Sequence, residues 1–179
     1  MTRYVALLGS INVGGNRLAM ADLRAALEAH GFANVATVVA SGNVLFDHST
    51  AADTVLEMQI AEIVKTRFGI DTFAAVRSQA ELETALAECP FAGIGEDKFV
   101  HVVFLEGQPD AAAFEKLAAD HAGRGVEKLA PGTRALHVDY VGGAGSSKLT
   151  GDFIARRLGC RGTARNIRSI RRMVEKMKA

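Results

Sequence analysis

Residues 35–47, VATVVASGNVLFD, decide how this chain folds. Two apolar segments flank Ser41-Gly42-Asn43, and a Gly-Asn pair is typical of the tight turn of a β-hairpin because both residues tolerate positive φ. The periodicity around this hairpin predicts, in chain order, a strand over 3–8, a helix over 20–30, strands over 35–40 and 43–47, a helix over 51–68 and a strand over 71–77. This order is that of a ferredoxin-like sheet.

The second half of the chain repeats this order of elements, although no repeat of residues accompanies it. A helix over 79–88 leads into a connector in which Pro90 and two glycines end the helix. The elements predicted beyond it are a strand over 98–105, a helix over 110–122, strands over 126–130 and 134–141 joined through Pro131-Gly132, and helices over 147–158 and 163–178. We therefore expect an α+β fold of two ferredoxin-like (βαββα-type) lobes with antiparallel sheets and C-terminal helices. The expected organisation is a first lobe over 1–78, a helix and connector over 79–97, and a second lobe with basic C-terminal helices over 98–179.

Six sequence strings, in this order, resemble the bacterial family called domain of unknown function 1697. They are YVALLGSINVGG (4–15), SGNV (41–44), ECPF (88–91), KFVHVVFLEG (98–107), GSSKLTGDFIARRLG (145–159) and TARN (163–166). The resemblance implies two ferredoxin-like lobes in a cytoplasmic bacterial protein and brings no established activity with it. This chain departs from the family pattern with Gly9-Ser10 where relatives usually have Arg-Gly, and with Ile167 where a Trp commonly follows the Asn. If that Arg contacts a ligand in relatives, the contact is missing here.

A glycine-rich loop, Gly9 to Gly15, follows the first strand and precedes the first helix. Backbone N–H groups of such a loop, together with the positive end of a helix, favour a bound anion. Because the first and third strands of the predicted sheet are adjacent and antiparallel, the loop should lie beside the hairpin. We expect a small anionic or phosphorylated ligand to be held by Asn12, Gly14, Gly15, Ser41 and Asn43. The alternative is that the glycines only satisfy turn geometry and the two asparagines cap backbone groups.

A second glycine-rich loop, Gly142 to Lys148, also precedes a predicted helix. Ser146 or Ser147 is a natural N-cap, which is the structural interpretation of this loop. In the functional interpretation, the amides of the first helical turn bind an anion together with Lys148, and Arg165 adds to this second anion contact.

Known nucleotide-binding motifs and catalytic constellations do not match the sequence. Gly15-Asn16 stands where a phosphate-binding loop needs Lys and Ser/Thr, and no G-x-G-x-x-G fingerprint occurs. The five histidines share no metal-ligand spacing, so no metal is predicted and the cofactor is unknown. His101 and His137 alternate with valines on second-lobe strands and could face the same sheet surface, where a structural role is the favoured interpretation. Whether the protein is an enzyme stays open.

Charge is distributed unevenly along the chain. Residues 1–145 carry 11 Lys/Arg against 18 Asp/Glu, a net of −7, whereas residues 146–179 carry 10 against 2, a net of +8. The last predicted helix has a basic stripe of Arg165, Arg168, Arg172 and Lys176 opposite an apolar one of Ile167, Ile170, Val174 and Met177. Such a tail either docks on its own acidic body or binds a polyanion. Nucleic acid is the less favoured partner because few aromatic residues are available to stack on bases. A structural or oligomerising protein without ligand is a third alternative.

The sequence contains no apolar stretch of signal-peptide or membrane-spanning length. Its two cysteines, Cys89 and Cys160, are far apart and lie in no metal-ligand spacing. We therefore expect a cytoplasmic protein with reduced thiols and no membrane partner.

Overall fold

A computed structural model of the chain describes residues 1–9, 17–38, 42–49 and 53–179. The chain divides into two compact units. The first comprises Met1–Leu82 together with Arg172–Ala179, and the second comprises Glu83–Arg171.

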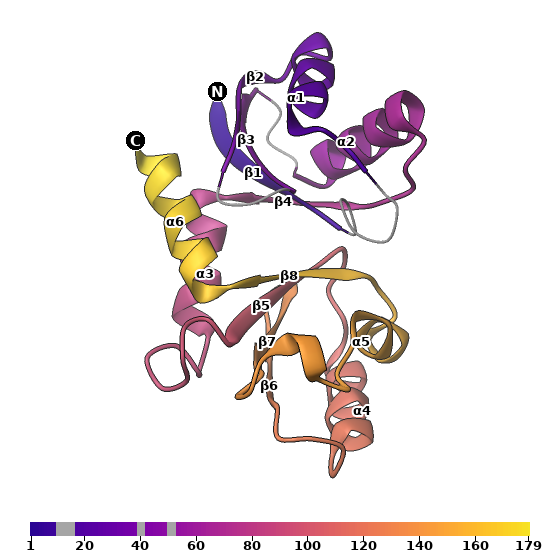
Figure 1. Ribbon diagram of the computed structural model, residues 1–179, viewed down its shortest axis with the longest axis vertical. Coiled ribbons are helices and arrows are strands. Elements are labelled where there is room, and N and C mark those ends of the chain that lie inside the picture. Colours follow the sequence, from indigo (N-terminus) through magenta and orange to yellow (C-terminus); the bar gives the residue numbers. More distant parts are fainter. Residues whose placement is uncertain (10–16, 39–41, 50–52) are drawn as a thin grey trace. The chain divides into compact units, whose positions relative to one another are not determined.

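The first unit contains a four-stranded antiparallel sheet with the order β2-β3-β1-β4. Its elements, in chain order, are β1 Thr2–Leu8, α1 Met20–Ala29, β2 Ala33–Thr37, β3 Asn43–His48, α2 Asp53–Phe68 and β4 Ala74–Ser78. Gly42, immediately before β3, has the positive φ that was predicted for it, +89°, but Asn43 has none, so the prediction that Gly42 and Asn43 together form the tight turn is wrong. Asn43 is already the first residue of β3 and pairs with Leu7 of β1. The ferredoxin-like fold expected from the order of elements is confirmed for this unit (Figure 1).

The second unit contains a sheet of the same topology, with the order β6-β7-β5-β8. The elements that follow β4 are α3 Gln79–Glu88, β5 Val100–Leu105, α4 Ala111–His121, β6 Lys128–Gly132, β7 Ala135–Asp139, the 3₁₀ helix η1 Ala144–Ser146, α5 Gly151–Leu158, β8 Gly162–Asn166 and α6 Ile167–Lys178. Both sheets are antiparallel throughout their described pairings. The α+β class with two similar lobes is therefore confirmed.

Three details of the second unit differ from the sequence-based prediction. Residues 163–166 belong to strand β8 rather than to the last helix, so the sheet gains the fourth strand that the predicted order lacked. Gly132 pairs with Ala135, so the hairpin turn is Thr133-Arg134 and not Pro131-Gly132; Arg134 takes a φ of +48° in it. Helix α5 begins at Gly151 after a Thr150 N-cap, whose hydroxyl accepts from the Phe153 N–H at 3.2 Å. Ser146 and Ser147 therefore do not cap this helix.

Each sheet has a hydrophobic core on the face that carries its helices. Helices α1 and α2 lie on one face of the first sheet, and α4 and α5 on one face of the second (Figure 1). Leu23 of α1 and Ile60 of α2 belong to the core of the first sheet, and Leu117 of α4 and Ile154 of α5 to that of the second. The alternation of side chains along each strand sends every second residue to this face. In β1 these residues are Tyr4, Ala6 and Leu8, and in β5 they are Val103 and Leu105.

The last strands of the two sheets repeat one another at the level of single residues. Arg77 of β4 lies opposite Val5 of β1, and Arg165 of β8 lies opposite Val102 of β5. The residue after each arginine caps the next helix: Ser78 Oγ accepts from the Glu81 N–H at 3.3 Å, and Asn166 Oδ1 accepts from the Ser169 N–H at 2.9 Å. Each sheet thus ends in the sequence arginine, N-cap, helix.

No helix within the described residues is long and apolar enough to cross a membrane.

Candidate functional site

The first glycine loop is described only at its edges, because Asn12, Gly14, Gly15 and Ser41 lie outside the described residues. The register of β1 on β3 places Leu7 opposite Asn43, and the Leu8 N–H donates to the Gly42 carbonyl at 2.8 Å. The described ends of the loop and of the hairpin therefore lie at the same end of the first sheet, as the strand order predicts.

The polar groups at these edges take part in contacts within the protein. The Gly9 N–H donates to the Phe73 carbonyl at 3.0 Å, and the Thr72 hydroxyl donates to the Gly9 carbonyl. Asn43 is 1% exposed, and its carbonyl accepts from the Val38 N–H. A Cβ atom at position 9 would collide with the Phe73 ring, so glycine fits the position of that ring. These described residues hold the end of the sheet together.

The second glycine loop forms one wall of a cleft of about 260 Å³ in the second unit. The loop leaves β7, passes through η1 and reaches Ser147 and Lys148 before α5 begins. Residues from the segment between α4 and β6 form the opposite wall. The complete lining consists of Arg124, Gly125, Val126, Glu127, Tyr140, Gly142, Gly143, Ser146, Ser147 and Lys148.

Glu127 is the buried polar group of this cleft, with a side chain that is 5% exposed. The Ser147 hydroxyl donates to Glu127 Oε1 at 2.6 Å, and His121 Nε2 lies 4.0 Å from Oε2. The hydrogen bond from Ser147 is the main cause that lowers the pKa of the Glu127 carboxyl. This carboxylate is therefore charged at neutral pH, and it adds to burial in raising the pKa of the Tyr140 phenol beside it.

Two cations stand at the mouth of the cleft. The Arg124 guanidinium lies 4.3 Å from the centre of the Phe153 ring, which is the geometry of a cation–π contact. Lys148 is exposed, and among the described residues its ammonium forms no ion pair. An anionic group at this mouth would meet one cation held by an aromatic ring and one that is free to turn toward it.

Arg165, the predicted partner of Lys148, lies elsewhere in the second unit. It lies on the face of the sheet opposite α4 and α5, since it is paired with Val102 and not with a residue of the helix-facing core. Its guanidinium donates to Thr163 Oγ1 at 2.7 Å and to the Ala164 carbonyl at 2.9 Å. Burial lowers the pKa of this guanidinium to about 10. The structure does not bring Arg165 to the cleft that Lys148 lines.

His101 and His137 do not share a sheet surface, so that prediction is wrong. His101 lies two residues from Val103 and faces the helices, where its ring meets the Tyr140 ring at 5.0 Å. His137 lies between Leu136 and Val138, which both face the helices, so it faces the other side. Burial lowers the pKa of both imidazoles. Among the described residues no group of three or more His, Cys, Asp and Glu side chains could hold a metal ion.

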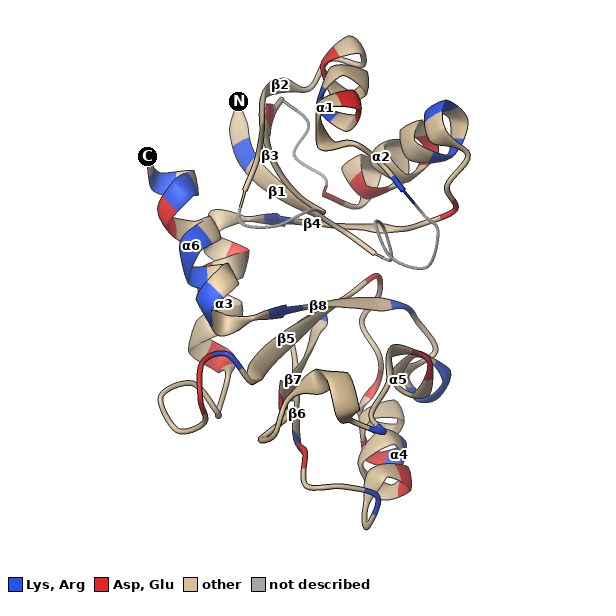
Figure 2. Cartoon of the chain, in the orientation of Figure 1, with Lys and Arg blue, Asp and Glu red and all other residues tan. Residues whose placement is uncertain are grey.

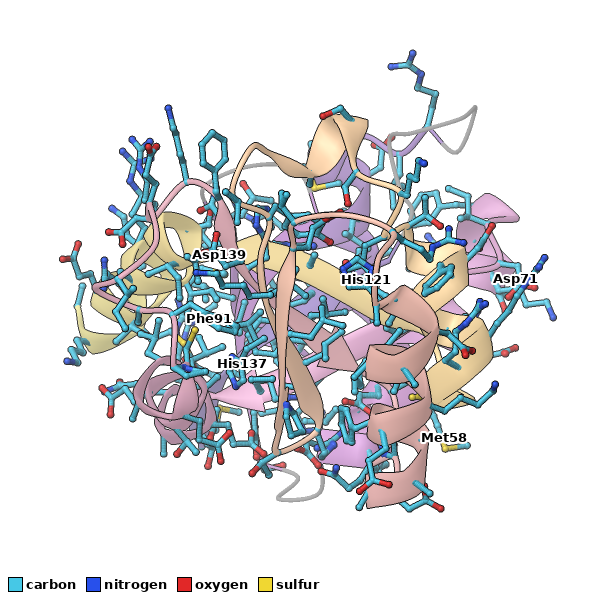
Figure 3. The ribbon with its side chains drawn as sticks, turned by 90° about the horizontal axis from the view of Figure 1, so that it is seen from below. Met58, Asp71, Phe91, His121, His137 and Asp139 are labelled. Carbon is cyan, nitrogen blue, oxygen red and sulfur yellow. The ribbon has the colours of Figure 1, made fainter. Side chains whose placement is uncertain are left out.

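The part of the cleft that lies outside the second glycine loop was not predicted from the sequence. Arg124 and Glu127 lie in the segment between α4 and β6, whereas Tyr140 follows β7, and no sequence motif joins these two places. His121 is the last residue of α4, whereas His137 and Asp139 belong to β7; all three are labelled in Figure 3. The two glycines on either side of Arg124, Gly123 and Gly125, are the local sequence feature that could have indicated this cleft. A Cβ at position 125 would collide with the Glu127 carboxylate.

Helix α6 separates apolar and basic residues as the sequence predicted. Its buried residues are Ile167, Ile170, Met173, Val174 and Met177. Arg168, Arg172 and Lys176 follow one another at helical spacing on the exposed side, and Figure 2 shows basic residues along the helix. Arg165 is not part of this stripe, because it lies in β8.

These features define a two-lobed α+β protein with a ferredoxin-like sheet in each lobe and a polar cleft in the second. Residues 1–137 match the family model described as "Protein of unknown function (DUF1697)", and the chain belongs to this family.

One solved structure, that of the conserved bacterial protein SP0830 from Streptococcus pneumoniae, is similar over the whole molecule. The similarity covers 100% of this chain and 99% of that chain, with a TM-score of 0.64 and 20% sequence identity. At this identity the likeness shows the shared fold alone. The comparison with curated proteins gave no match.

Proposed function

We propose that the protein binds a small anionic or phosphorylated ligand in the cleft of the second glycine loop. The observation that carries this proposal is the pair of cations, Arg124 and Lys148, at the mouth of one cleft. The Glu127 carboxylate at its base repels a second anion, so the anionic group of the ligand would stay at the mouth. A hydroxyl or amine of the same ligand would point inward and donate to Glu127. Sugar phosphates and other phosphorylated polyols have both groups.

The first glycine loop stays a prediction as a second anion site, since four of its five named residues are outside the described part of the chain. A bacterial cytoplasm likewise stays a proposal.

The variant Lys148→Ala tests this anion site. Wild-type protein should be stabilised by about 2.7 kcal/mol when glucose 6-phosphate is present at a hundred times its dissociation constant. Lys148→Ala removes a charge-assisted contact and should weaken binding about tenfold or more, which lowers the stabilisation at the same concentration to about 1.4 kcal/mol or less. Differential scanning fluorimetry with a titration of the ligand measures both values.

Lys65→Ala is the matched control, because Lys65 is an exposed lysine of α2 that does not line the cleft. The unliganded melting temperature of both variants should stay near that of wild type, since neither side chain is buried. The proposal is wrong if glucose 6-phosphate, inorganic phosphate and pyrophosphate all leave wild-type melting unchanged, and that result would favour a structural protein without ligand.

Binding of a polyanion along α6 is the second candidate, favoured by the exposure of its basic residues while the apolar ones are buried. Arg168 and Arg172 contribute two of the charges in this stripe. The double variant Arg168→Glu, Arg172→Glu should abolish binding of a short single-stranded RNA or duplex DNA. Wild-type affinity should fall steeply with salt, because each phosphate contact releases counterions.

Fluorescence anisotropy over 50–200 mM salt measures this binding. If a duplex binds wild type and the double variant equally well, or if its affinity does not change with salt concentration, α6 is not the binding site.

A further inference from the structure

The first unit contains a larger cleft that the proposed function does not use. Its volume is about 490 Å³, within the range typical of ligand sites. It lies between the end of α1, the end of β3 and one side of α2. The lining residues are His30, Phe32, His48, Met58, Gln59, Glu62, Ile63, Thr66 and Arg67.

Aromatic rings form a fixed wall of this cleft. The Phe32 ring packs edge-on against Phe46, with ring centres 5.0 Å apart, and the centre of the His48 ring also lies 5.0 Å from that of Phe32. Phe32 is 3% exposed, and Phe46 is fully buried in the core of the sheet. Because this packing holds the wall in one arrangement, a flat ligand ring would meet a surface that is already formed.

His30 supplies a directed hydrogen-bond acceptor at the edge of this wall. Its Nδ1 lies 2.7 Å from the Ala26 carbonyl, which can only accept, so Nδ1 carries the proton. In the neutral imidazole, Nε2 is then the acceptor. A ligand N–H is the group that fits opposite it.

Helix α2 contributes two rows of side chains, each spaced by four residues. Gln59, Ile63 and Arg67 form the inner row, since Ile63 is 6% exposed. Met58, Glu62 and Thr66 form the outer row. The Thr66 hydroxyl donates to Glu62 Oε1 at 3.1 Å, so the Glu62 carboxylate already has a partner. A ring over Ile63 would therefore have the Gln59 amide at one end and the Arg67 cation at the other.

Met58 is the most exposed apolar side chain of the cleft, with 75% of its surface in solvent (Figure 3). A flexible thioether at the edge of an aromatic pocket is well suited to fold over a bound ring, because sulfur–aromatic contacts are favourable and the side chain adapts to its partner.

We propose that this cleft binds a planar heteroaromatic ring that carries an N–H donor and an anionic substituent. The ring lies over Ile63 between the Phe32 wall and Met58. Its N–H donates to His30 Nε2, and its anionic group pairs with Arg67. This site is in the first unit and shares no residue with the cleft of Arg124 and Lys148.

Methyl NMR tests the proposal, with indole-3-acetate and adenosine 5′-monophosphate as probes. A ring stacked on Met58 shifts the ¹³C-labelled methyl signal of that residue upfield, and Met58→Leu identifies the signal by its loss. At least one probe should give a saturable upfield shift. Cyclohexane carboxylate has the same charge as indole-3-acetate but no aromatic ring, so it should give none.

Two variants separate the contacts. His30→Phe keeps a ring and removes the acceptor, and Arg67→Ala removes the cation; each should weaken binding roughly two- to tenfold. Val55→Ala is the matched control, since Val55 is an exposed residue of α2 outside the cleft. This variant should bind the aromatic probe with the affinity of wild type.

Three results would overturn the proposal. The first is the absence of an upfield shift with either aromatic probe at millimolar concentration. The second is an equal shift with cyclohexane carboxylate. The third is full affinity of both His30→Phe and Arg67→Ala for the probe, when melting shows that these variants are folded. Lys148→Ala distinguishes the two sites, because it should leave the Met58 shift unchanged whether or not the anion site in the second unit exists.

Discussion

Replacing Glu57 with alanine should lower the free energy of unfolding by about 3–5 kcal/mol, the typical effect of removing one partner from a buried ion pair. The Glu57 side chain is 11% exposed and accepts from Arg77 Nη1 at 3.0 Å, and the Arg77 side chain is 4% exposed. Glu57 Oε1 also accepts from the Val76 N–H at 3.0 Å, so the same carboxylate caps a backbone donor of β4. The truncation leaves a buried guanidinium without this charge. Urea denaturation of both proteins measures the difference.

Glu28→Ala is the control for this prediction. Glu28 pairs with Arg24 at 3.2 Å on the exposed side of α1, and such a pair is worth only about 0.3–0.5 kcal/mol. The double variant Glu57→Met, Arg77→Met should recover most of the loss, because apolar side chains of similar size need no compensating charge. If Glu57→Ala costs no more than Glu28→Ala, the pair does not stabilise the first sheet.

Acid should destabilise the second unit through His137. The His137 side chain is 0% exposed, and among the described residues neither ring nitrogen has a hydrogen-bond partner. Burial lowers its pKa from the usual 6.5, although the Glu88 carboxylate 3.9 Å away opposes part of this effect. The unfolded chain therefore binds a proton at a higher pH than the folded chain does. Stability is complete above about pH 6.5 and falls as the pH drops through the interval between the two pKa values.

His137→Leu should remove this contribution, which reaches at most about 1.4 kcal/mol per pH unit for one proton. Glu88→Gln should increase the acid sensitivity. Without the carboxylate charge, the folded-state pKa of His137 is lower still, so the free energy of unfolding continues to fall to a lower pH. Chemical denaturation at intervals between pH 7.5 and 5 gives the slopes. Equal slopes in wild type and His137→Leu would show that other groups, such as the half-buried His101, cause the acid sensitivity.

The first sheet could be predicted from the sequence because its signals are local. Gly42 before β3, the long helix α2 and the short apolar strands can each be recognised from a few neighbouring residues, and their order along the chain is that of a ferredoxin-like sheet. The prediction failed at β8 for a physical reason. Thr163, Arg165 and Asn166 are polar residues of an edge strand only five residues long, and their spacing continues into the amphipathic pattern of α6. The helical periodicity of α6 therefore extends back into β8 in the sequence, and the predicted helix began at residue 163 instead of residue 167.

The candidate site was less predictable than the fold. Lys148 was identified because it follows a glycine-rich loop, which is a property of the local sequence. Glu127 and Arg124 lie in an irregular segment after α4, and they matter only because β6 and β7 bring that segment beside the loop. Such proximity depends on register and turn length, which periodicity does not specify.

The composition of the first unit has a consequence for the order in which the protein folds during synthesis. Its packing includes Arg172–Ala179 as well as Met1–Leu82, whereas the second unit is one continuous segment. On the ribosome, domains generally fold in the order in which they emerge. Here the unit that emerges first is completed last, after the segment 83–171 has left the ribosomal tunnel. The second unit can therefore reach its final structure before the first one does, because the segment 83–171 leaves the tunnel before residues 172–179 are available to complete the first unit.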